Sequence, residues 1–75
     1  MTIKDKDKLV IIAQAYFYLK GAFTSKDIST FIKTNDFGFR SDPTITQIGA
    51  LISRSRKFEV IEVNRNANVY GVKGK

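Results

Sequence analysis

The chain has 75 residues, which is enough for one domain with a modest core but not for a second domain or an ordinary buried catalytic cavity. It contains no Cys and no His, which excludes disulfides and thiolate metal sites and removes the commonest general base. Thirteen Lys and Arg against seven Asp and Glu give a net charge of +6, which favours a polyanionic partner. We therefore expect one domain over residues 1–75 that is not an enzyme and uses no cofactor or metal.

The N-terminal third predicts a helix of about fifteen residues, because apolar side chains from Leu9 onward recur every three or four residues. Gly21 stands where a left-handed C-terminal cap is expected. The longest apolar run, residues 9–13, is too short to cross a membrane, and no signal-peptide core precedes it. We expect a cytoplasmic protein without membrane contact, with residues 1–6 and 74–75 frayed.

A second helix is predicted to begin at Ser25 or Lys26, because Thr24 and Asp27 have the spacing of a capping box. Its buried stripe includes Ile28, and Asn35 marks its end. Residues 22–23, just before it, are expected to form a very short strand.

The next segment, residues 36–43, is expected to be a loop whose two phenylalanines either cover the core or meet a partner chain. A third helix follows over residues 44–57. Its start is open between Asp42, which precedes Pro43, and Thr44, which forms a second capping pair with Gln47. Its predicted core side consists of Ile45, Ile48, Leu51 and Ile52.

Two β-rich runs, residues 58–63 and 69–72, predict a hairpin around the Asn-rich turn "NRNAN". Strict alternation of apolar and polar residues fails at Val60 and Ile61. Either one of them lies at a strand end, or the sheet is buried on both faces.

The outer side of the third helix is unusual, because no acidic residue occurs between Asp42 and Glu59. Solvated helix faces usually carry long Glu and Lys chains. Gln, Arg, Ser, Thr and Ala instead suit base edges in a DNA major groove, and Gly49 would let the backbone approach closely. The outer side carries Thr46, Gln47, Ala50, Ser53, Arg54 and Lys57.

The order helix, short strand, helix, helix, two-stranded antiparallel hairpin resembles an α+β winged helix-turn-helix domain over residues 9–73. More narrowly, the small Lys-rich chain resembles the stand-alone transcriptional regulators encoded by archaea and by their viruses and plasmids. The resemblance implies sequence-specific binding of double-stranded DNA, with helix 44–57 in the major groove and the wing, residues 64–68, on the backbone or minor groove.

Two sets of contacts follow from the residue types and from this resemblance. Base contacts are expected from Thr46, Gln47, Ala50, Ser53 and Arg54. Phosphate or wing contacts are expected from Thr44, Ser25, Lys26, Arg40, Arg56, Lys57, Asn64, Arg65, Asn66 and Asn68.

The expected regulator is a homodimer, because a monomer this small covers only a few base pairs. The first helix, with its spare aromatic face, is the expected dimer surface, and no small-molecule ligand is evident. Two alternatives are open: a winged helix that contacts other proteins, or a protein that coats DNA without regard to sequence.

Overall fold

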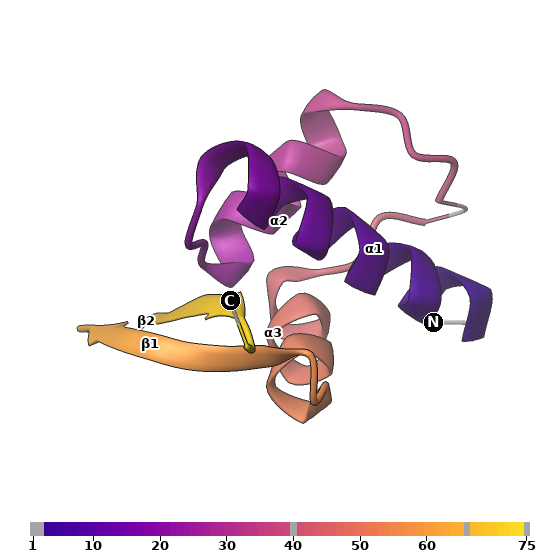
Figure 1. Cartoon of the computed structure of the whole chain (residues 1–75). Coiled ribbons are helices and arrows are strands. Elements are labelled where there is room, and N and C mark those ends of the chain that lie inside the picture. The colour runs from indigo at the N-terminus through magenta and orange to yellow at the C-terminus, as the bar shows by residue number, and fades with distance from the viewer. Residues whose placement is uncertain (1–2, 40, 66, 75) are drawn as a thin grey trace.

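The computed structural model describes residues 3–39, 41–65 and 67–74, and the fold is α+β: three helices followed by a two-stranded antiparallel hairpin. Figure 1 shows the hairpin projecting away from the helices, with α3 next to the start of β1. The elements are α1 (Ile3–Lys20), α2 (Ser25–Thr34), α3 (Ile45–Arg54), β1 (Phe58–Asn64) and β2 (Ala67–Val72).

The C-terminal end of α1 and the N-terminal end of α2 form the caps that their sequences predict. Gly21, with φ +93°, caps α1, and its backbone N–H donates to the carbonyl of Phe17 at 2.8 Å. The Thr24 and Asp27 capping box forms at the start of α2, so that prediction is confirmed. With 18 residues, α1 is longer than expected, because it begins at Ile3 and includes the charged segment 4–8.

The predicted third helix is too long at its C-terminal end. Thr44 is the N-cap, with Gln47 as its capping partner, so the alternative start at Asp42 is wrong. The helix ends at Arg54, because the N–H of Ser55 already closes the last turn and Lys57 turns the chain into β1. Arg56 and Lys57 therefore lie in a turn and not on the helix.

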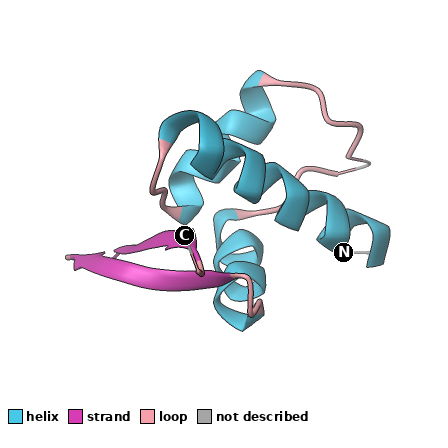
Figure 2. Ribbon diagram, in the orientation of Figure 1, coloured by secondary structure: helices cyan, strands magenta, loops and turns pink. Residues whose placement is uncertain are grey.

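The short strand predicted at residues 22–23 is absent as a strand, and the sheet has two strands instead of three (Figure 2). Phe23 makes a single bridge to Tyr70, with hydrogen bonds in both directions at 3.1 and 2.7 Å. This bridge is isolated, so the pairing covers a single residue.

The broken alternation at Val60 and Ile61 has a different cause from either predicted one. The strand pairing shifts between Val60 and Glu62, which leaves Ile61 as the extra residue of a β-bulge. Both apolar side chains are about half exposed. The sheet is therefore not buried on both faces, and neither residue lies at the end of β1.

Phe23 lies at the centre of the core, and all three helices and the hairpin contribute side chains to this core. Its ring is fully buried and packs edge-on against Tyr16 and Phe58, with Tyr70 tilted beside it. Burial, and then the Asp27 carboxylate, raise the pKa of the Tyr16 hydroxyl above its ordinary value, so this core-edge tyrosine stays neutral. The core residues are Leu9, Ile12, Ala13, Phe23, Ile28, Ile32, Ile48, Ile52, Phe58, Tyr70 and Val72.

The two loop phenylalanines cover this core. Phe37 packs against Phe31 with ring centroids 5.4 Å apart, and the ammonium of Lys8 lies 5.1 Å from the centroid of Phe39. Lys8 also donates to the carbonyl of Gly38. Of the two predicted roles for these aromatics, the structure therefore shows the first, which is to cover the core.

Candidate nucleic-acid interface

The outer face of α3 carries all five predicted base-contact residues in exposed positions. Thr46, Ala50 and Arg54 are spaced by four residues, so they form one line along the helix. The predicted core side is only partly right, because Ile48 and Ile52 are buried but Ile45 is 48% exposed. Ile45 stands in the first turn, where the neighbouring elements leave a hollow.

Gln47 has a structural role in addition to its exposed position. Its side-chain oxygen accepts the N–H of Thr44 at 3.0 Å, and the Thr44 hydroxyl accepts the N–H of Gln47 at 3.1 Å. The side-chain NH₂ of Gln47 makes no hydrogen bond within the described residues. A base edge would therefore meet a donor whose direction is fixed by the capping box.

Ser53 faces the hairpin side of α3. Its hydroxyl is hydrogen-bonded to the hydroxyl of Tyr70, with 3.0 Å between the oxygens. Tyr70 is buried and is also the residue that bridges to Phe23. The predicted base contact of Ser53 would compete with a bond that fixes the hairpin against α3.

Gly49 serves the contact between α2 and α3. A Cβ built on Gly49 would lie 2.9 Å from the hydroxyl oxygen of Ser25, which is closer than real Cβ atoms come. Gly49 therefore has a structural reason in the approach of α3 to Ser25, and the predicted approach of its backbone to DNA stays a prediction.

One flank of α3 adjoins the first helix. Lys6, from the N-terminal part of α1, lines a hollow with α3 residues, and we call it the α1–α3 hollow; its lining is Lys6, Gln47, Ala50, Leu51 and Arg54. Lys6 was not predicted as a site residue, because sequence periodicity places it near a frayed end and gives no sign that α1 packs beside α3. The structure thus adds a second cation beside Gln47 and Ala50.

The other flank of α3 adjoins α2 and the hairpin. There the start of α2 and the start of β2 enclose what we call the α2–hairpin hollow, lined by Thr24, Ser25, Lys26, Ile45, Ala67, Asn68 and Tyr70. Three predicted phosphate-contact residues, Ser25, Lys26 and Asn68, meet at this hollow. Ile45, which is about half exposed, also lines this hollow.

The tip of the hairpin holds Arg65 in a conformation that arginine rarely adopts. The strands pair as far as Asn64 and Ala67, and Arg65 between them has φ +49°. Gly, Asn and Asp are the usual residues at such positions, because a Cβ crowds the backbone there at a cost of roughly 1 kcal/mol, which Gly avoids and Asn and Asp offset by local hydrogen bonds. Two further predicted contacts, Arg40 and Asn66, lie outside the described residues.

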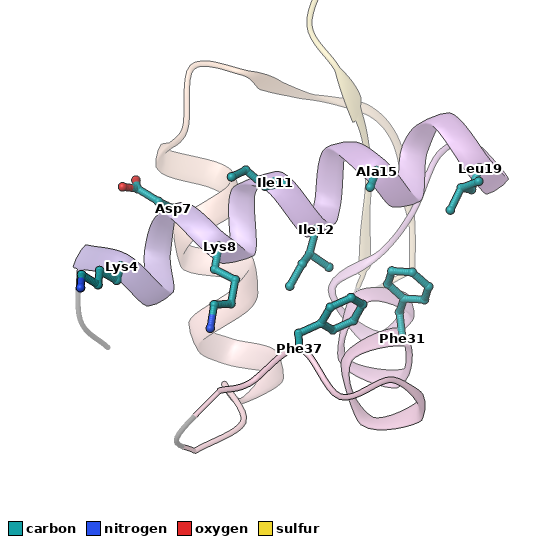
Figure 3. Close-up of a pocket in the computed structure, with 9 residues that line it drawn as sticks. All are labelled: Lys4, Asp7, Lys8, Ile11, Ile12, Ala15, Leu19, Phe31 and Phe37. Atoms are coloured by element: carbon teal, nitrogen blue, oxygen red, sulfur yellow. The ribbon is translucent and has the colours of Figure 1, made fainter.

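A separate apolar groove runs along α1 (Figure 3), and Ile12 of α1 faces Phe31 and Phe37 across it. Ile11 and Leu19 remain 64% and 74% exposed along its rim. The groove, which we call the α1 groove, is lined by Lys4, Asp7, Lys8, Ile11, Ile12, Ala15, Leu19, Phe31 and Phe37.

Within the described ranges, no group of acidic side chains is placed to hold a metal ion. Among the same residues, no helix has the length and apolar character needed to span a membrane. Comparisons with protein-family models, with curated proteins and with solved structures find no match to this chain.

Proposed function

We propose that this chain is a winged-helix protein that binds double-stranded DNA with sequence preference and regulates transcription. One observation carries the proposal: the exposed face of α3 holds Thr46, Gln47, Ala50 and Arg54 without an acidic residue, and a lysine lines the hollow on each flank. A hairpin that follows the third helix directly is compatible with this fold.

In the proposed complex α3 enters a major groove, which is wide enough for an α-helix. Arg54 reads a guanine and the side-chain NH₂ of Gln47 meets an acceptor on a base edge, while Thr46 and Ala50 allow close contact with thymine methyl groups. Ser25 and Lys26, at the start of α2, hold phosphate oxygens, and Thr44 does so at the start of α3. Arg56 and Lys57 serve the same purpose from the turn after α3, and the hairpin tip with Asn64, Arg65 and Asn68 lies along the backbone or minor groove.

The strained conformation of Arg65 supports its part in this proposal. A turn alone would be better served by Asn or Gly, so the local cost of arginine calls for a compensating role. A guanidinium at the tip of a projecting hairpin reaches a narrow minor groove or a phosphate, and either contact uses its charge.

The proposal is tested by selecting bound duplexes from a random pool and titrating the best one at several salt concentrations. We expect a consensus sequence and an affinity that falls steeply with salt. Salt-dependent binding without any consensus would favour sequence-neutral coating. A chain that binds no duplex even at low salt would leave the protein-contact alternative.

Gln47 offers a test that separates folding from base reading. Gln47→Glu keeps the side-chain acceptor for the Thr44 N–H, so the free energy of unfolding should stay within about 0.5 kcal/mol of wild type. Gln47→Ala removes that acceptor and should lower it by about 0.5–1 kcal/mol.

Both variants should lose sequence preference at one base position, and Gln47→Glu should bind DNA less tightly than Gln47→Ala because it adds a negative charge at the interface. Urea unfolding and duplex titration give the two readouts. Unchanged DNA preference in both variants would limit Gln47 to its capping role.

We also propose that the functional form is a homodimer joined through α1. Between Leu9 and Leu19, apolar side chains surround this helix: Leu9 and Ala13 are buried inside, while Ile11, Tyr18 and Leu19 remain exposed. A helical segment that is apolar nearly all round is usually covered on more than one side. Contact at the α1 groove leaves the exposed face of α3 open, so a second copy would double the DNA footprint.

The dimer predicts a specific effect of Ile11→Glu. This change places two carboxylates in the apolar contact and should reduce the mass in solution from dimer to monomer, measured by sedimentation at micromolar concentrations. Val63→Glu, at a similarly exposed apolar position on the hairpin, should leave the dimer intact. A wild-type chain that sediments as a monomer contradicts the dimer proposal but not DNA binding.

A further inference from the structure

The two hollows lie on opposite flanks of the outer face of α3. At 100° per residue, Gln47 lies about 60° to one side of the line through Ala50, and Gly49 lies about 100° to the other. Gln47 lines the α1–α3 hollow, whereas Gly49 contacts Ser25 of the α2–hairpin hollow. The exposed face of α3 is thus a ridge between two depressions.

DNA imposes the same geometry on any helix in its major groove. The groove is about 12 Å wide and is bordered on each side by the phosphates of one strand. A helix about 10–12 Å across fills this width, so the elements on its two flanks face the two backbones. The phosphate contacts predicted from the sequence that line a flank of α3, namely Ser25, Lys26 and Asn68, all lie at the α2–hairpin hollow.

We propose that Lys6 binds a phosphate of the second strand, and this inference rests on the proposed DNA-binding function. Lys6 is exposed and belongs to a different helix from Arg54, yet the two side chains line one hollow. Two cations that share a hollow repel each other in the free protein, and a phosphate between them removes that repulsion. Lys6 is thus a phosphate contact that positions α3 in the groove and carries no sequence information.

Other charges on α1 do not reverse this assignment. Asp5 and Asp7 lie about 100° to either side of Lys6 around the helix, and Asp7 lines the α1 groove together with Lys4 and Lys8. Among the charged residues of α1, Lys6 alone lines the α1–α3 hollow within the described part of the chain.

The test compares Lys6→Gln with Lys20→Gln, which makes the same change of charge on the same helix. Lys20 lines a separate depression between α1 and α2, together with Asp27 and Thr34. Each lysine–phosphate contact adds about 0.9 to the slope of log affinity against log salt, which corresponds to about eightfold in affinity at 0.1 M relative to 1 M salt.

We expect Lys6→Gln to flatten the slope by about 0.9 and to weaken binding about eightfold at 0.1 M salt, equally for selected and unrelated duplexes. Lys20→Gln should change neither quantity. Circular dichroism melting of both variants checks that the fold is intact, which exposure of both side chains predicts.

The outcomes separate the two proposals. If wild-type protein binds DNA with a steep salt slope and Lys6→Gln behaves like Lys20→Gln, the assignment of Lys6 is overturned and the proposed function stands. If Lys6→Gln changes the preferred sequence, the residue reads bases and the phosphate assignment is equally wrong. If wild-type protein does not bind DNA, the proposed function itself fails.

Discussion

Phe23→Ala is expected to lower the free energy of unfolding by about 3–5 kcal/mol, the usual cost of removing a fully buried aromatic ring. A domain of 75 residues has a total stability of about 4–11 kcal/mol, so this loss removes at least about a quarter of it. The effect is large because the ring contacts α1 through Tyr16, β1 through Phe58 and β2 through Tyr70.

Phe39→Ala is the matched control for this change. Phe39 is only partly buried, and its ring lies beneath the ammonium of Lys8 at the edge of the core, so we expect a loss of about 1 kcal/mol. Urea unfolding followed by circular dichroism measures both variants. Equal losses in the two variants would mean that Phe23 is not the centre of the core.

Arg54→Ala is expected to weaken binding to the selected duplex by about 1–3 kcal/mol, which is tenfold or more for the middle of this range. The loss should concentrate on one base pair, because a guanidinium that bonds a guanine bidentately discriminates against other bases. Binding to unrelated duplexes should fall much less. Titration against a set of single-base variants of the selected duplex measures this pattern.

Arg65→Asn is the contrasting change at the hairpin tip. We expect weaker binding to all duplexes and a salt slope flatter by about one unit, because Arg65 contributes charge and not base reading. The free energy of unfolding should rise by up to about 1 kcal/mol, since Asn tolerates the left-handed conformation at this position.

Comparing the two arginine variants separates base reading from a general loss of charge, because each variant removes one positive charge. If both change affinity in the same way for every duplex, α3 is not the reading element and the assignment of Arg54 is wrong. If Arg65→Asn stabilises the fold without affecting DNA binding, then a DNA contact does not explain the strained conformation of Arg65.

Local signals were predictable from the sequence because they depend on a few adjacent residues. The capping pairs at Thr24 and Thr44 are of this kind, as is the glycine cap at Gly21. In each case, one side chain or one backbone angle satisfies free backbone groups at a helix end, and no distant part of the chain is needed.

The wrong or missed predictions concern features that depend on contacts between segments far apart in the sequence. Periodicity alone assigned Ile45 to the core, but it lines the hollow between α2 and the hairpin and is about half exposed. The end of α3 at Arg54 depends on how the chain turns into β1, with Lys57 accepting a hydrogen bond from Lys73. Lys6 became a candidate only once α1 was seen to lie beside α3.

The outer face of α3 divides into positions without a structural contact and positions whose side chains also stabilise the fold. Within the described residues, the side chains of Thr46, Ala50 and Arg54 make no hydrogen bond to another part of the protein, whereas Gln47 caps the helix and Ser53 holds Tyr70. A combinatorial library at positions 46, 50 and 54 would therefore sample new surface chemistries on an unchanged scaffold. Under the proposed function, the same division lets three positions change the DNA sequence that is preferred without loss of the fold.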